Sequence, residues 1–119
     1  ESQGTTMPHL IIEYARELEL PVPATLHALH HSLLDSGLIE EVDIKIRAQA
    51  YADYLVGGAA ENRFVHLNVL VMDGRSEAVK KQLANALCET VKQHLGDVQH
   101  TQITAEVRDM LQATYAKIR

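Results

Sequence analysis

The chain has 119 residues, of which 46% are hydrophobic, and its net charge of −5 reflects 16 acidic against 11 basic side chains. This length suits one domain that buries roughly two-thirds of its unfolded surface. The acidic balance and the lack of a basic run argue against a nucleic-acid partner. No apolar stretch approaches the ~20 residues of a membrane span, and the single cysteine, Cys88, excludes an internal disulfide. We therefore expect a cytoplasmic protein.

The first six residues, ESQGTT, carry no apolar pattern. We interpret residues 1–6 as an expression leader in front of a single domain over residues 7–119. The alternative is a native polar arm in which Met7 is internal. In both interpretations the first strand begins directly after Met7-Pro8.

The first half of the chain has a strand–helix–strand pattern. A strand is predicted over 9–14, a helix over 23–36 and a second strand over 42–50. Pro23 suits the first turn of the helix, and Gly37 suits the position just past its end. The second strand alternates, with Val42, Ile44, Ile46 and Ala48 on one face.

The second half repeats this order after a connection over 51–62, in which Gly57-Gly58 predicts a turn. Its elements are a strand over 63–72, a helix over 76–95 and a strand over 101–108. Ser76 suits the N-cap of the helix, and Gly96 suits its end. After this last strand we expect a short helix or an arm.

Each half is long enough for a right-handed βαβ unit with parallel strands. Two such units predict an α+β fold, with a four-stranded mixed sheet and two helices on one face. The other face stays open, and Phe64, Leu70 and Met72 make it too apolar to be simply solvated. A large, partly apolar open face implies packing against other subunits.

Pro8, at the head of the first strand, is a candidate catalytic residue. Proline lacks an N–H and suits the first residue of a strand, so the plain interpretation is a structural one. If Met7 is the natural start and is removed, however, Pro8 carries a free secondary amine. Burial lowers the pKa of an amine, and a base works best with a pKa near the operating pH. In the chain that begins at Glu1, Pro8 is an amide and cannot act as a base.

Three segments resemble the tautomerase superfamily, and within it the 5-carboxymethyl-2-hydroxymuconate isomerase family. They are the opening Met7-Pro8-His9-Leu10-Ile11-Ile12-Glu13, the segment Phe64-Val65-His66 at the start of the third strand, and Gly74-Arg75-Ser76 before the second helix. The order and lengths of the elements agree as well. The resemblance covers residues 7 to about 108.

This resemblance implies a homotrimer, a proton transfer without a cofactor, and a dicarboxylate or tricarboxylate enol substrate from aromatic catabolism. The catalytic proline of the family corresponds to Pro8, and a substrate-binding arginine corresponds to Arg75. A second family arginine falls at Lys45, and Arg47 matches another basic position. Lysine keeps the charge but loses the bidentate fork that binds a carboxylate, so Lys45 is a departure that bears on the substrate.

Each candidate also has a structural interpretation. Lys45 and Arg47 suit a solvated strand edge, and Arg75 suits a solvated charge directly before a helix. The helix macrodipole slightly disfavours a cation there, however, and a carboxylate bound at a helix N-terminus would be favoured, which supports a functional role for Arg75. His27 and His31 stand at i and i+4, but no third ligand has matching spacing, so we predict no metal site.

The sequence thus predicts a trimeric isomerase that moves a proton in a small unsaturated 2-hydroxy or 2-oxo carboxylate, with Pro8 as acid and base. One alternative is a dehalogenase, hydratase or decarboxylase of the same superfamily, in which the proline cation acts as an acid. Another is a non-enzymatic trimer that binds a ligand or a protein. The physiological substrate and the direction of flux stay open.

Overall fold

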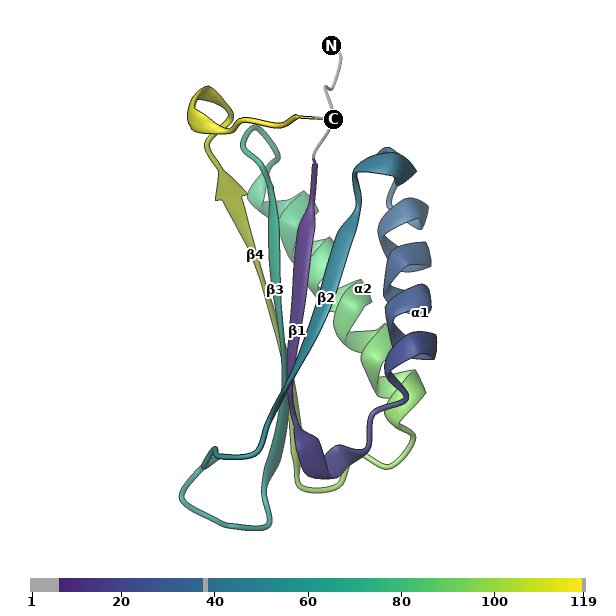
Figure 1. Cartoon of the computed structure of the whole chain (residues 1–119), viewed down its shortest axis with the longest axis vertical. Coiled ribbons are helices and arrows are strands. Elements are labelled where there is room, and N and C mark those ends of the chain that lie inside the picture. The colour runs from purple at the N-terminus through teal and green to yellow at the C-terminus, as the bar shows by residue number, and fades with distance from the viewer. Residues whose placement is uncertain (1–6, 38, 119) are drawn as a thin grey trace.

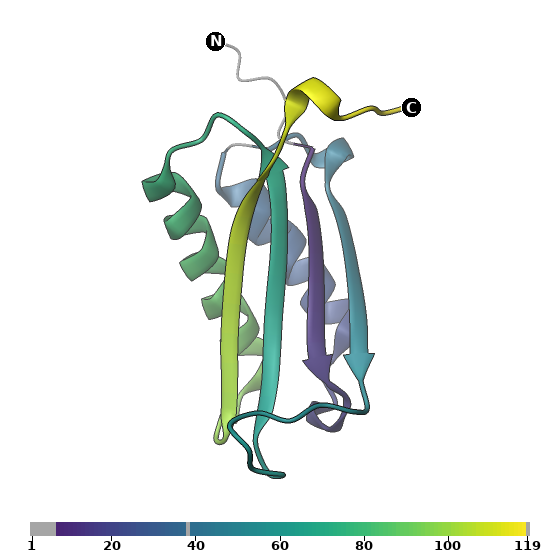
Figure 2. The same cartoon turned by 90° about the vertical axis from the view of Figure 1, so that its left-hand side faces the viewer.

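The computed structural model describes residues 7–37 and 39–118, so residues 1–6, interpreted above as a leader, lie outside the described part. The described residues form a four-stranded sheet with two long helices packed against one face (Figures 1 and 2). The predicted α+β class and the placement of both helices on one face are confirmed. No helix in the described ranges is both long and apolar enough to cross a membrane.

The elements follow the predicted order. The strands are β1 (His9–Ala15), β2 (Lys45–Tyr51), β3 (Arg63–Met72) and β4 (Thr101–Met110), the long helices are α1 (Val22–Asp35) and α2 (Glu77–Leu95), and the short 3-10 turns are η1 (Arg16–Leu18), η2 (Glu41–Asp43) and η3 (Gln112–Thr114). Ser76 caps α2 by accepting a hydrogen bond from the Val79 amide at 3.2 Å. Gly96 ends α2 with a φ of 74°, a value that favours glycine.

The strand order is β2-β1-β3-β4, which places β1 and β3 at the centre. The pairs β1–β2 and β3–β4 are parallel, and the two halves join through the antiparallel pair β1–β3. His9 lies opposite Lys45 on one side and Leu70 on the other. Two βαβ units in one mixed sheet are therefore confirmed.

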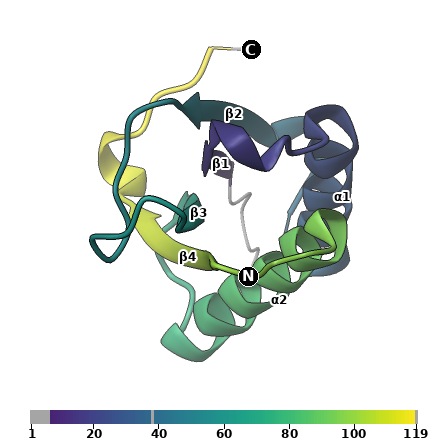
Figure 3. The ribbon, with the colours of Figure 1, turned by 90° about the horizontal axis from the view of Figure 1, so that it is seen from below.

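The core lies between the sheet and the helices, as the view along the strands shows (Figure 3). Alternate residues of the central strands supply one wall, because successive side chains of a strand point to opposite faces. The buried residues of the core include Leu10, Ile12, Val65, Leu67 and Val69 from the sheet, and Leu29, Leu33, Leu83, Leu87 and Val91 from the helices.

The opposite face carries no helix in the described structure. Phe64 and Leu70 are half-buried there, and Phe64 packs against Tyr51 and Tyr54 near the end of the sheet where β3 begins. Met72 belongs to this face by alternation, but it is only 4% exposed. It lines a cavity with residues of the segment after β4, which explains why it does not contribute to the open surface as expected.

Most boundaries lie within two residues of the prediction, but the start of β2 differs by three. Residues 41–43 form the turn η2 instead of the start of β2, since the amides of Asp43 and Ile44 bond to the carbonyls of Glu40 and Glu41. Val42 is consequently 71% exposed, whereas Asp43 is buried. The alternation expected from Val42 onward therefore begins only within β2.

The connection between β2 and β3 confirms the predicted turn. Gly57 and Gly58 have φ values of 60° and 76°, and Val56 pairs with Ala59 across them. Two successive positive φ values are typical of the tight turns that join antiparallel segments. The last segment also matches expectation: η3 is followed by a stretch that crosses the end of the sheet (Figure 1), where Lys117 contacts Asp43 of η2.

Candidate active site

The site is built on the head of β1. The Pro8 side chain is fully buried, and its carbonyl oxygen accepts a hydrogen bond from the Lys45 amide at 3.2 Å. Proline has no backbone N–H, so its burial here leaves no hydrogen-bond donor without a partner. The parallel pairing of β1 and β2 thus begins at Pro8 and fixes its place at the end of the sheet.

Lys45 and Arg47 lie on the open face of β2, next to β1. The Lys45 ammonium donates to the Asp43 carbonyl oxygen at 2.5 Å. The Arg47 guanidinium, which is exposed, donates from Nη1 to Nδ1 of His9 at 3.2 Å. The two cations predicted as substrate-binding residues therefore stand beside Pro8 and the residue after it.

Arg75 lies in the connection between β3 and α2. Gly74, with a φ of 114°, allows the sharp change of direction before it. Its Nε atom is buried and finds no hydrogen-bond partner among residues 7–37 and 39–118. Because β3 runs antiparallel to β1, its last residues lie at the end of the sheet where β1 begins, and Arg75 follows there. Within those ranges no hydrogen bond or ion pair joins Arg75 to Pro8, Lys45 or Arg47.

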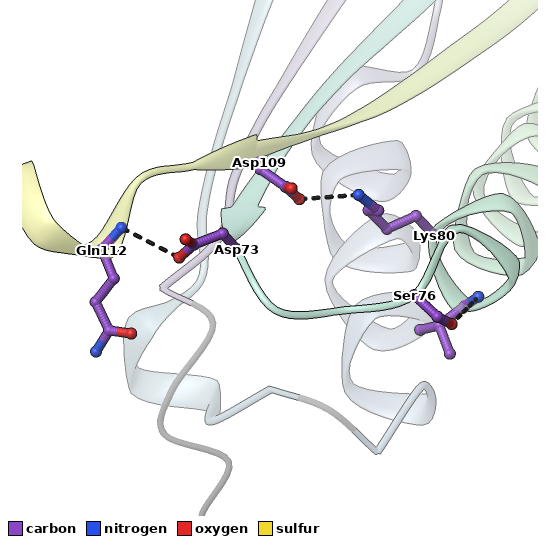
Figure 4. Close-up of polar contacts among 6 residues, drawn as sticks. Asp73, Ser76, Lys80, Asp109 and Gln112 are labelled. Carbon is purple, nitrogen blue, oxygen red and sulfur yellow. Dashed lines mark hydrogen bonds and ion pairs between the residues drawn. The ribbon is translucent and has the colours of Figure 1, made fainter.

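The turn that carries Arg75 is held by neighbouring polar contacts (Figure 4). Asp73 accepts a hydrogen bond from the Gln112 amide at 3.2 Å, and Lys80 pairs with Asp109 at 3.0 Å. The first contact ties the β3–α2 connection to η3, and the second ties α2 to the end of β4. Polar contacts on both sides of Arg75 in the sequence therefore hold the turn that carries it.

The segment after β4 is the part of the site that sequence reasoning missed. It turns across the end of the sheet at which β1 begins (Figures 1 and 2). The Tyr115 hydroxyl lies 3.0 Å from Nε2 of His9, and the Lys117 ammonium pairs with the buried Asp43 carboxylate at 2.5 Å. The sequence does show a basic residue, Lys117, in a short segment after the last strand. A lone lysine, however, does not indicate which acidic residue it will contact.

The contacts of His9 define its protonation. A guanidinium can only donate, so Nδ1 of His9 accepts from Arg47, and the neutral ring carries its proton on Nε2. That proton is donated to the Tyr115 oxygen. Burial, and then the charges of Lys45 and Arg47, lower the pKa of His9 below its ordinary value. His9 is therefore a neutral link between Arg47 and the C-terminal segment at neutral pH.

A cavity of about 260 Å³ opens at this end of the sheet. Its lining residues are Met7, Met72, Gln112, Tyr115 and Lys117. Larger hollows of about 520 and 540 Å³ lie between α2 and β4 and between α1 and β2, but they contain none of the predicted site residues. We base the candidate site on the smaller cavity, because Met7 is bonded directly to the Pro8 nitrogen.

The histidines of α1 do not form a metal site in the described structure. His27 and His31 border the hollow beside β2 together with His30, whose Nε2 lies 2.8 Å from the Glu41 carboxylate. Within residues 7–37 and 39–118, no group of three or more histidine, cysteine or acidic side chains is placed to hold a metal ion.

A mixed sheet of two βαβ units, with a proline heading its central strand, defines a tautomerase-like protein. The sequence matches the 5-carboxymethyl-2-hydroxymuconate isomerase family over residues 8–117. The chain therefore belongs to this isomerase family. This membership confirms the resemblance drawn from the three sequence segments.

Solved structures agree with this assignment. A 5-carboxymethyl-2-hydroxymuconate isomerase from Deinococcus radiodurans R1 is 30% identical, with 97% of this chain and 91% of that chain covered and a TM-score of 0.86. A 5-carboxymethyl-2-hydroxymuconate delta-isomerase is 21% identical over 97% and 89%, with a TM-score of 0.73. A fused 4-OT protein, described as an asymmetric trimer, shares the fold at 17% identity over 92% and 91%, with a TM-score of 0.71. A comparison with curated proteins finds no match.

The lowered pKa of His9 predicts a pH-dependent contribution to stability. Between the ordinary pKa of histidine, about 6.5, and the lower folded value, the unfolded state binds more protons than the folded state, so stability falls as the pH falls. Glutamine does not titrate in this range. We therefore expect the unfolding free energy of the wild type, relative to that of His9→Gln, to fall as the pH is lowered from about 8 to about 5. Urea unfolding at several pH values measures this, and parallel pH dependences of the two proteins would contradict it.

Proposed function

We propose that the protein moves a proton in a small unsaturated 2-hydroxy or 2-oxo di- or tricarboxylate, such as 5-carboxymethyl-2-hydroxymuconate, with Pro8 as the acid and base. The observation that carries this proposal is the buried Pro8 at the head of β1, next to the basic residues of β2. Membership of the isomerase family supports the reaction type. The proposal applies to a chain in which Pro8 is the first residue.

The reaction needs one group that can accept a proton and return it. The neutral secondary amine of Pro8 takes the proton from the enol hydroxyl, and the electron pair of that O–H bond forms the carbonyl. The conjugated double bonds shift, and a distant carbon of the substrate takes the proton back from the prolinium ion. The amine is regenerated, so the step balances without an oxidant or a reductant, and it works best if the amine pKa lies near neutrality.

The basic residues bind the substrate and stabilise the charge that develops on its oxygen. Arg75 is the strongest candidate for a carboxylate contact, because its buried Nε lacks a partner in the described ranges and a guanidinium can bind a carboxylate with two hydrogen bonds. Lys45 and Arg47 already donate to Asp43 and His9. They contribute positive potential near the developing dienolate oxygen.

We also propose that the protein is a homotrimer. The open face of the sheet carries half-buried apolar side chains, and the structurally similar fused 4-OT protein is described as a trimer. An exposed, partly apolar face of this kind is typical of an interface. Light scattering at micromolar concentration should give about three times the chain mass of 13.2 kDa, and the mass of a monomer would contradict the trimer.

The proposed role of Pro8 predicts that activity depends on where the chain begins. A chain that starts at Pro8 should isomerise 2-hydroxymuconate, whereas the chain that starts at Glu1 should be inactive or nearly so, because an amide nitrogen has no basic lone pair. Steady-state assays of both proteins on the same substrate measure this.

The rate of the Pro8-initiated chain should also rise with pH through an apparent pKa below that of a free amine, since burial and nearby cations both favour the neutral form. Equal activity of the two chains, or a flat profile from about pH 5 to 9, would mean that Pro8 is not the base.

Replacement of Arg75 tests the proposed carboxylate contact. Arg75→Ala should raise KM, lower kcat and reduce kcat/KM by roughly 10- to 150-fold, the range that a lost charge-assisted hydrogen bond produces. Arg16→Ala is a matched control, because Arg16 is exposed in η1, which follows the other end of β1. An Arg75→Ala enzyme as active as the control would remove Arg75 from the site.

A further inference from the structure

We propose that the segment after β4 forms one wall of the substrate site, and that Lys117 binds the second carboxylate of a dicarboxylate substrate there. This inference rests on the function proposed above and adds a specificity-determining residue to it. Its basis is the cavity lined by Met7, Met72, Gln112, Tyr115 and Lys117.

The cavity lies beside the reacting atom of the proposed mechanism. Met7 is one of its walls, and the Met7 carbonyl carbon is bonded to the Pro8 nitrogen. In a chain that starts at Pro8 the wall formed by Met7 is gone, so the cavity opens onto the amine. The remaining walls are Met72 from β3 and the three residues after β4. A volume of about 260 Å³ suits a small substrate, since it is below the range typical of drug-sized ligands.

The C-terminal segment is fixed in place at two points. Tyr115 is bonded to His9, which Arg47 holds from its other nitrogen. Lys117 is paired with Asp43, whose side chain is 4% exposed. A residue that bonds to a buried partner loses little further freedom when a ligand arrives, so this wall is preorganised for binding.

Lys117 is the cation of this wall, and it keeps donors available. An ammonium group has three N–H donors, and the contact with the Asp43 carboxylate needs only one of them. The neighbouring Lys45 ammonium also lies against Asp43, where it donates to the backbone carbonyl, so two ammonium groups and one carboxylate meet at this residue. Their summed charge stays positive, and a substrate carboxylate in the cavity would compensate it.

The placement of Lys117 favours a substrate with two separated carboxylates. Arg75 lies in the β3–α2 connection, at the end of the sheet where β1 begins, whereas Lys117 lies on the side of β2, where it contacts Asp43. One carboxylate bound at each position would hold the conjugated chain of the substrate across the Pro8 nitrogen. A monocarboxylate could use only one of the two.

The test uses the chain that starts at Pro8 and a pair of ligands that differ in one carboxylate. trans,trans-Muconate and sorbate share a six-carbon diene, but sorbate has a methyl group in place of one carboxylate. Isothermal titration should show that Lys117→Gln weakens muconate binding about tenfold or more. Sorbate binding should stay within about twofold, and Lys117→Arg should retain most of the muconate affinity.

Two further variants separate charge from the placement of the segment. Lys92→Gln removes a lysine from the last turn of α2, away from the cavity, and should bind both ligands like the wild type. Tyr115→Phe removes the bond to His9 but no charge, so it should change the binding of both ligands by the same factor. If Lys117→Gln also weakens both ligands equally, or if the wild type does not prefer muconate, Lys117 does not bind a second carboxylate.

Turnover assays, run in parallel, distinguish a failure of the proposed Lys117 site from a failure of the proposed function. They use 2-hydroxymuconate, which has two carboxylates, and phenylenolpyruvate, which has one. A protein that binds muconate through Lys117 but turns over neither substrate would contradict the isomerase mechanism and support the binding site. An active enzyme whose Lys117→Gln variant loses the same factor in kcat/KM on both substrates would overturn the role of Lys117 alone.

Discussion

Backbone pairing on both sides of β1 is the constraint on which the candidate site depends. β1 lies between β2 and β3, and its pairing with β2 begins at the carbonyl of Pro8. The proline can be buried at this point because it has no N–H that would need a partner. The same burial places the ring nitrogen at the edge of the core, where a free amine would be partly removed from water. The fold thus supplies the environment that the proposed acid–base chemistry needs.

The charge distribution at this end of the sheet differs from that of the whole chain. The chain carries a net charge of −5, yet Lys45, Arg47, Arg75 and Lys117 gather at or near the start of β1. Three acidic side chains nearby have partners: Asp43 pairs with Lys117, Asp109 with Lys80, and Asp73 accepts from an amide. Glu13 and Glu17 lie toward the other end, where they bond to tyrosines. Under the function proposed above, this cluster of positive charge would attract an anionic substrate to the end of the sheet where β1 begins.

The sequence predicted the sheet well because its signals are local. Alternation in 63–72 and capping residues at 76 and 96 determine β3 and α2 from within a few residues, and the structure has both elements where they were expected. The start of β2 was misplaced for an equally local reason. Two carbonyls of residues 40 and 41 accept amides three residues on, and this turn interrupts an alternation that an apolar Val42 had suggested. Hydrophobic pattern alone does not distinguish such a turn from a strand.

Four residues of the candidate site, Pro8, Lys45, Arg47 and Arg75, were predicted from local sequence features together with the family resemblance. Pro8 heads a strand, and Arg75 stands between a glycine and a helix cap, so both could be found from their neighbours in sequence. His9, Asp43, Tyr115 and Lys117 could not, because their contacts join residues 74 and 106 positions apart. Those contacts form only when both βαβ units share one sheet, since β4 must reach the end of β1 before the segment after it can cross to β2. The head of β1 and the segment after β4 therefore meet as a consequence of the sheet order, which no single segment of the sequence encodes.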